Sequence, residues 1–235
     1  MFTVSFVIVK SITERIGKMK RNKTLICGFL FIICFIIWTM LLQTVDVKSI
    51  GINSTNIGFA TINVWFHNLT GVHFILYLIT DWLGLVPVFV CFCFGIMGFV
   101  QLIKRRSLLK VDIDIIILGV YYILVIFLYL FFEMVPINYR PILINGFMEC
   151  SYPSSTTLLV LSVMPTLVIQ SNFRIKSISL KRIIANLAYI FSFFMIIGRL
   201  VSGVHWLTDI IGSILLSVGL VYVYKSIVMM CYKER

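Results

Sequence analysis

Long apolar runs separated by shorter polar stretches set the pattern of this chain. The runs approach the roughly 20 residues that a helix needs to cross the hydrocarbon core of a bilayer. They lie at 24–44, 82–103, 112–132, 153–171, 183–199 and 205–229. The charged fraction is only 12% and the mean hydropathy is +1.06, whereas about a quarter of the residues of a soluble domain are charged. The pattern predicts an all-α protein, a bundle of six transmembrane helices.

The polar stretches predict how the chain is organised around these spans. The expected parts are a basic cytoplasmic segment at 1–23, a single six-span membrane domain at 24–229 and a cytoplasmic tail at 230–235. The longest connection, 44–81, is too aromatic for a plain solvated loop. We expect it to form a pair of interfacial helices over the outer end of the bundle, from which His67 and His73 are able to approach a site.

The net charge of +11 is distributed unevenly along the chain. If the six spans are right, 17 of the 20 Lys and Arg residues lie on the side that holds both termini. The positive-inside rule makes that side the cytoplasm of a cell membrane, and this placement argues against a nucleic-acid partner. The remaining three, Lys48, Arg140 and Arg199, fall on the outer side. Anion binding is one reason for their position, and snorkelling towards lipid headgroups is the alternative.

An ionisable cluster interrupts the apolar pattern before the last span, at Arg199, His205 and Asp209. Such side chains are costly in a membrane segment unless they are paired or functional. His205 and Asp209 share one face if the segment from Val204 onward is helical. An aspartate there can fix the imidazole tautomer, as a nucleophilic or general-base histidine requires. The alternative is structural, with an interfacial arginine, a capping histidine and an aspartate in a polar contact.

Three polar stretches share the outer side, at 139–141, 152–156 and 198–209. In this order they resemble the type 2 phosphatidic-acid phosphatase superfamily, relatives of bacterial acid phosphatases and vanadium haloperoxidases. The family pattern is K-x6-R-P, P-S-G-H and S-R-x5-H-x3-D. Here Arg199, His205 and Asp209 keep the spacing of the third motif, with Gly198 in place of its serine. The resemblance implies a core like that of these acid phosphatases and haloperoxidases, within the membrane branch of the family.

The resemblance also implies a covalent mechanism. The histidine at the position of His205 attacks phosphorus and forms a phosphohistidine, and the aspartate at the position of Asp209 orients it. No metal or other cofactor is needed. The cysteines agree with this expectation, because their positions suggest neither a disulfide framework nor a metal site.

The implied phosphate site uses residues from all three stretches. Arg140 and Arg199 clamp the non-bridging oxygens, for which a planar guanidinium is suited. Ser154 and Ser155, with the backbone N–H groups that begin the fourth span, complete the cradle, because a helix N-terminus favours anions.

Two residues depart from the family pattern. Glu133 stands where the lysine of the first motif is expected, and we expect it to pair with Arg140 or Arg199 instead of facing phosphate. Thr156 takes the catalytic position of the histidine that protonates the leaving oxygen. A lipid alkoxide needs that proton, whereas a leaving phosphate is stable as an anion near neutral pH. The departure therefore favours a lipid or isoprenoid diphosphate over a monoester.

The sequence predicts an enzyme that hydrolyses a lipid or isoprenoid phosphate or diphosphate at the outer membrane face. Two alternatives stay open: a phosphotransferase with a lipid acceptor, and a catalytically impaired membrane protein that binds lipid phosphates. A transporter or channel is disfavoured, because the span centres hold almost no ionisable residues. The identity of the lipid and the oligomeric state do not follow from the sequence.

Overall fold

The computed structural model describes residues 2–233, with side chains described from 21 to 231. This part of the chain is all-helical, and no strand occurs in it. The α-helices are α1 (Phe2–Leu42), α2 (Ala60–Thr70), α3 (Phe74–Leu83), α4 (Leu85–Arg105), α5 (Ile113–Met134), α6 (Ser155–Arg174), α7 (Ile178–Val201) and α8 (Leu207–Lys233). Short 3-10 turns lie at Ile52–Ser54 and Leu108–Lys110.

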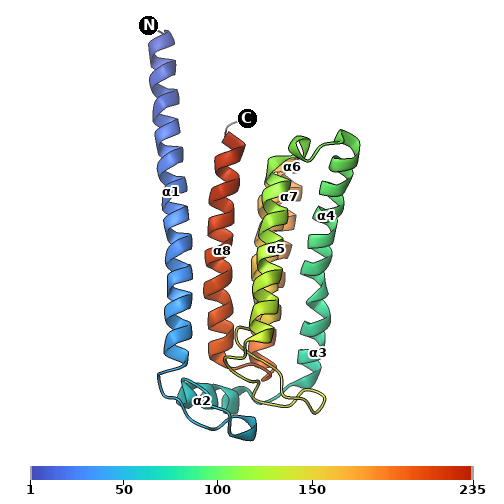
Figure 1. The fold of residues 1–235 in the computed structure, drawn as a ribbon. Coiled ribbons are helices and arrows are strands. Elements are labelled where there is room, and N and C mark those ends of the chain that lie inside the picture. The colour runs from blue at the N-terminus through green and yellow to red at the C-terminus, as the bar shows by residue number, and fades with distance from the viewer. Residues whose placement is uncertain (1, 234–235) are drawn as a thin grey trace.

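Within the described residues, six helical segments are long and apolar enough to cross a membrane, which confirms the predicted bundle. The chain ends of the drawn fold lie at one end of this bundle, and α2 with the longer loops lies at the other (Figure 1). We call these the terminal end and the loop end. Residues 2–20 continue α1 beyond its span as one helix. Of the expected tail, 230–233 belong to α8, and 234–235 lie outside the described residues.

The second span differs from the prediction. It covers Phe74–Arg105, because α3 and α4 follow each other with only Gly84 between them. Only α2 therefore has the expected place across the loop end of the bundle (Figure 1). The period and hydrophobicity of 74–83 fit both a lipid-facing and an interfacial helix, so the sequence pattern could not separate them.

The first and last helices pack closely through two glycines. A Cβ atom on Gly28 of α1 would lie 2.9 Å from Val223 Cγ2, and one on Gly219 of α8 would lie 2.8 Å from Ile32 Cγ1. Small residues at helix contacts allow backbones in a membrane to approach closely. α1 is therefore an integral part of the bundle as well as an anchor.

Serine hydroxyls join α8 to the first turns of α6. Ser213 Oγ donates to Ser154 O at 3.0 Å, and Ser217 Oγ donates to Leu158 O at 3.2 Å. All four residues are buried. Such bonds between helices satisfy polar groups that have no water to bind in the bilayer. They fix the start of α6 against the start of α8, where the polar stretches meet.

Candidate active site

The loop between α5 and α6 folds back on itself and reaches the start of α8. Arg140 N donates to Glu149 O at 3.0 Å, and Ser151 N donates to Asn138 O at 2.9 Å. Trp206 Nε1 donates to Tyr139 O at 2.8 Å. The three polar stretches singled out in the sequence therefore meet at the loop end.

His205 lies between α7 and α8 and is 3% exposed. Its Nδ1 lies 3.1 Å from Ser151 O, an acceptor, so Nδ1 carries the proton. Its Nε2 lies 3.3 Å from Arg199 Nη2, a donor. Burial, and then the charges of Arg140 and Arg199, hold the pKa of His205 well below its usual value. The ring is therefore neutral near pH 7, with its Nε2 lone pair directed at a cation.

Asp209 supports the turn that carries His205. Its Oδ2 accepts from Trp206 N at 2.9 Å and lies 3.6 Å from His205 Nδ1. Its Oδ1 accepts from Asn138 Nδ2 at 3.5 Å, and the residue is fully buried. Since α8 begins at Leu207, His205 precedes the helix. The shared helical face expected for the pair is wrong, and a turn capped by Asp209 brings the two side chains together instead.

Arg199 is fully buried in the last turn of α7. Its Nη1 donates to Asp81 Oδ1 at 3.4 Å, while Nε has no hydrogen-bond partner in the described structure. The guanidinium lies over the ring of Tyr77, 5.1 Å from the ring centroid. An aromatic face attracts a cation, so Tyr77 helps to hold Arg199 in place.

Arg140 approaches the same ring from the loop, with its guanidinium 5.8 Å from the Tyr77 centroid. It is 7% exposed, and its Nε lies 3.2 Å from Glu149 Oε2. Nη1 has no hydrogen-bond partner among the described residues. The two arginines thus converge on one face of the site, and each retains a buried N–H group without an acceptor.

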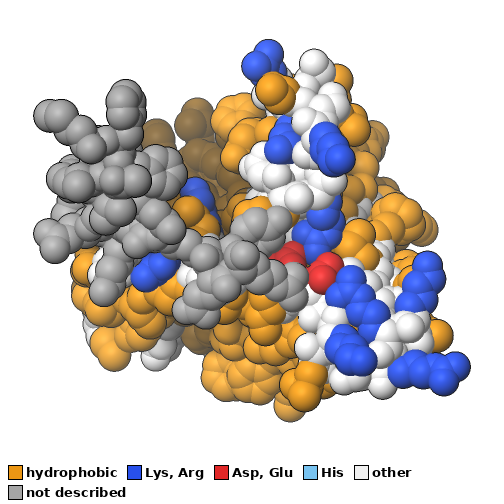
Figure 2. All heavy atoms as spheres, turned by 90° about the horizontal axis from the view of Figure 1, so that it is seen from above, with side chains coloured by type: hydrophobic (Ala, Val, Ile, Leu, Met, Phe, Trp, Pro, Cys, Tyr) orange, Lys and Arg blue, Asp and Glu red, His pale blue; other side chains and the backbone are white. Residues whose placement is uncertain are grey.

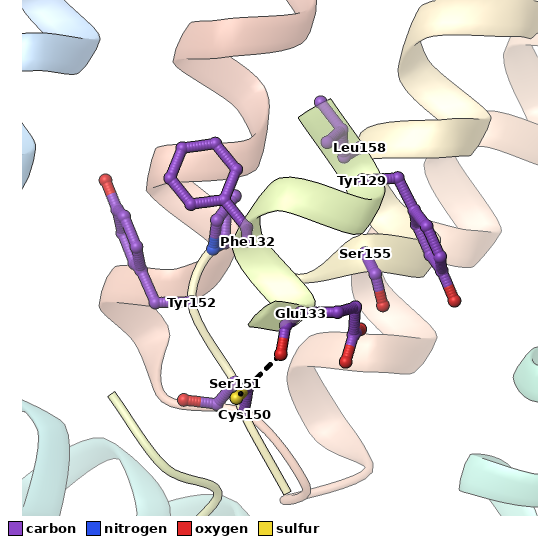
Figure 3. A pocket seen from close by; sticks show the side chains of 9 residues that line it. Tyr129, Phe132, Glu133, Cys150, Ser151, Tyr152, Ser155 and Leu158 are labelled. Atoms are coloured by element: carbon purple, nitrogen blue, oxygen red, sulfur yellow. Dashed lines mark hydrogen bonds between the residues drawn. The ribbon is translucent and has the colours of Figure 1, made fainter. Parts of the chain in front are cut away.

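The expected pairing of Glu133 with an arginine is wrong. Within the described structure Arg140 pairs with Glu149, and Arg199 pairs with Asp81. Glu133 is exposed at the end of α5 and lines a small pocket with Ser155 and Cys150 (Figure 3). Cys150 Sγ donates to Glu133 O at 3.4 Å. Glu133 and Ser155 therefore lie beside each other, in a pocket whose lining includes neither arginine.

The remaining predicted residues begin α6. Ser154 is fully buried; its N–H donates to Asp209 O at 3.3 Å, and its hydroxyl is bonded to Thr157 Oγ1 at 3.1 Å. Both groups are thus engaged within the protein. Thr156 lines a different space, a cavity of about 410 Å³ between α4, α5 and α6 that also holds Asp81. The two serines of the predicted cradle and Thr156 therefore lie in three different surroundings.

The histidines of the 44–81 connection do not contact His205 in the described structure. The ring of His67 packs against Trp206, with centroids 5.6 Å apart, and burial lowers the pKa of His67. His73 is exposed, and its Nε2 lies 2.9 Å from Thr70 O. The backbone near His73 nevertheless supports the site, because His73 N donates to Ser202 O at 3.0 Å.

Gly203 is required where the backbone before His73 crosses the loop that carries His205. Its φ is +71°, a conformation that favours glycine. A Cβ atom there would lie 2.1 Å from Gly71 O. The two loops therefore pack with backbone against backbone.

Several residues of the site escaped the sequence analysis, namely Asp81, Glu149, Asn138, Tyr77 and Ser151. One signal was available for the two carboxylates, because the chain has only nine acidic residues. Acidic residues near membrane spans are costly unless they are paired or functional. No comparable signal marks Ser151, which acts through its backbone carbonyl.

No cluster of three or more His, Cys, Asp or Glu side chains suited to a metal ion occurs in the described part of the chain. Comparison with known proteins gives two matches. The model of the PAP2 superfamily, the type 2 phosphatidic-acid phosphatases, matches residues 115–233. None of the curated proteins matches the chain.

One solved structure resembles the whole bundle. It is a transmembrane PAP2-type phosphatidylglycerolphosphate phosphatase from Bacillus subtilis, with a TM-score of 0.56 and 16% sequence identity. The match covers 88% of this chain and 96% of that one. At this identity the likeness concerns the fold. Since the family model covers half of the chain and the fold agrees over most of it, the protein belongs to the membrane branch of the PAP2 superfamily.

Proposed function

We propose that the protein hydrolyses a lipid or isoprenoid diphosphate through a phosphohistidine on His205. Family membership and the fold support a membrane lipid phosphatase in general. One observation carries the finer proposal: Nε2 of a neutral, buried histidine faces Arg199, while Nδ1 is held by Ser151 O. A nucleophile needs this arrangement of lone pair and proton.

The arginines supply the charge that the reaction needs. Arg140 and Arg199 keep buried N–H groups without acceptors among the described residues, and both guanidinium groups lie over the ring of Tyr77. Buried donors of this kind are rare unless an anion or water binds them. Phosphoryl oxygens satisfy such donors and gain most when charge spreads over them in the transition state.

In the proposed first step, His205 Nε2 attacks the terminal phosphorus and the lipid monophosphate leaves. Charge on Nδ1–H is stabilised by Ser151 O and by Asp209, whose Oδ2 lies 3.6 Å away. Thr156 offers a hydroxyl in place of a general acid, so we expect a leaving phosphate to be much faster than a leaving alkoxide. Water then releases inorganic phosphate from the histidine.

Phosphate release by the purified protein tests this proposal. Farnesyl diphosphate and phosphatidic acid serve as the diphosphate and monoester probes. We expect rapid release from the first, slow release from the second, and loss of both with His205→Ala. His73→Ala is the matched control, because this exposed histidine lies outside the site.

Four results would contradict parts of the proposal. Activity that survives His205→Ala would refute the nucleophile. Rapid release from phosphatidic acid with none from the diphosphate would refute the substrate class. Tight binding of lipid phosphates without release would favour the binding protein, and phosphate recovered on a lipid alcohol would favour the transferase.

We also propose that the loop end faces outward in a cell membrane. Lys and Arg side chains gather on the terminal end (Figure 2), and the positive-inside rule makes that end cytoplasmic. Phe147 of the loop end is 73% exposed. With the six native cysteines replaced by serine, Phe147→Cys is expected to react with an impermeant maleimide in intact cells. Reaction only after lysis would reverse the orientation.

A further inference from the structure

We propose that Asp81 is the general base that activates the water releasing phosphate from phosphorylated His205. This inference rests on the proposed function. The second half of the reaction needs a base, and Thr156 offers none. Asp81 lies in α3, outside the segment matched by the family model.

The guanidinium of Arg199 places Asp81 beside the reacting atom. Arg199 Nη1 lies 3.4 Å from Asp81 Oδ1, and Arg199 Nη2 lies 3.3 Å from His205 Nε2. One planar group thus contacts both residues. A phosphoryl group on Nε2 whose oxygens bind Arg199 would lie next to the Asp81 carboxylate. The positive charge of Arg199 would then offset the repulsion between the two anions.

Exposure distinguishes Asp81 from the other carboxylate next to His205. The side chain of Asp81 is 53% exposed, whereas that of Asp209 is fully buried and bonded to Trp206 N and Asn138. Asp81 also lines the cavity that holds Thr156, the position of the missing histidine. Asp81 therefore shares a cavity with the position of the missing histidine.

Glu149 is the nearest competitor and serves as the matched control. It is 41% exposed and lies 3.2 Å from Arg140 Nε. However, Arg140 has no hydrogen bond with His205 in the described structure, whereas Arg199 has one. Glu149 is therefore expected to influence phosphate binding and not the release step.

The proposed release step is the hydrolysis of phosphorylated His205. The water oxygen attacks phosphorus, and one water proton passes to Asp81. The P–Nε2 bond breaks, and its electron pair returns to Nε2 of His205. The products are inorganic phosphate, neutral His205 and protonated Asp81, which returns its proton to solvent. The contact of the Asp81 carboxylate with Arg199 places it to accept the proton of the attacking water.

Rapid-quench kinetics with farnesyl diphosphate labelled in its terminal phosphate tests the assignment. With Asp81→Asn we expect phosphorylation of His205 within about threefold of wild type and release slower by on the order of 10²-fold. Labelled phosphoenzyme then accumulates, with a burst of about one farnesyl monophosphate per site. Glu149→Gln should show neither burst nor accumulation, and formate should partly restore turnover in Asp81→Ala.

The outcomes separate this inference from the proposed function. Wild type without phosphoenzyme or phosphate release refutes the proposed function itself. Wild-type phosphorylation with unchanged release in Asp81→Asn overturns only the role of Asp81. Slow phosphorylation in Asp81→Asn without accumulation also overturns it, since Asp81 would then act only by positioning Arg199. If Asp81→Asn does not fold, Asp81→Ala with and without formate decides: rescue supports the base, and no rescue refutes it.

Discussion

Arginines paired with carboxylates occur at both ends of the bundle, but their surroundings differ. At the terminal end, Arg174 Nη2 lies 2.5 Å from Asp114 Oδ2, and its other groups contact Gln170 and Met97. Gln170 is bonded in turn to Tyr224 at 2.7 Å. At the loop end, Arg199 and Arg140 keep buried N–H groups that have no partner in the part of the chain that the structure describes. The first arrangement is complete within the protein, whereas the second has room for a further anion.

The difference teaches how to distinguish two uses of the same side chain. A satisfied network joins helices, here α4, α5, α6 and α8, and gains nothing from a ligand. An arginine held on one side by a half-exposed carboxylate and on the other by an aromatic ring retains donors for an anion. The following predictions test this comparison, beginning with the largest effect.

Arg199→Ala should lower kcat/KM for farnesyl diphosphate by on the order of 10³-fold, because it removes a donor to the developing charge next to Nε2. Phosphate release by the purified variant measures this effect. Arg199→Lys should remain strongly impaired, because an ammonium lacks the fork that joins Asp81 to His205. Near-normal activity in Arg199→Ala would mean that the two ends of the bundle do not differ as described.

Arg174→Ala should lower stability and leave kcat/KM nearly unchanged, the opposite of Arg199→Ala. It leaves Asp114, whose side chain is 6% exposed, without its ion-pair partner, and we expect a loss of about 3 kcal/mol in stability. The fraction that stays folded should retain kcat/KM within about threefold of wild type. Thermal unfolding in detergent with parallel activity measurements provides the check. A large loss of kcat/KM without destabilisation would contradict the structural role.

Inorganic phosphate should stabilise the wild type by about 2.7 kcal/mol at a concentration of one hundred times its Kd. Arg140→Ala should weaken this protection, because it removes one of the two converging guanidinium groups. Lys48→Ala is the control, since this exposed lysine of the loop end pairs with Asp46. Equal protection in all three proteins would place the phosphate elsewhere.

The smallest effect concerns pH. The pKa of His205 is lowered in the folded protein, so the unfolded chain binds more protons below its usual pKa of about 6.5. This contribution to stability is complete above that pH and decreases as pH falls, by about 1.4 kcal/mol per unit until the folded pKa is reached. Melting temperatures between pH 7.5 and 5 should therefore fall less steeply in His205→Gln. Parallel curves would contradict the neutral, buried histidine.

The sequence was sufficient for the parts of the site that depend on local spacing. The six spans follow from hydropathy, and the motif from Arg199 to Asp209 lies within one turn and the helix ends that flank it. The pairing of charges could not be obtained in this way. Glu133 is only seven residues from Arg140, yet Arg140 pairs with Glu149. The loop folds back so that Arg140 N donates to Glu149 O, and this brings the two side chains together. Such a return depends on tertiary packing, as does the approach of Asp81 to Arg199.

The close contact of α1 with α8 through Gly28 and Gly219 has a consequence for biosynthesis. α1 packs against the helix that follows all the other described helices in the sequence, so its partner is absent until those helices have been made. Trp38 at the end of α1 donates to Thr208 O beside Asp209, at 3.2 Å. The candidate site is therefore complete only once α8 has been made and has packed against α1.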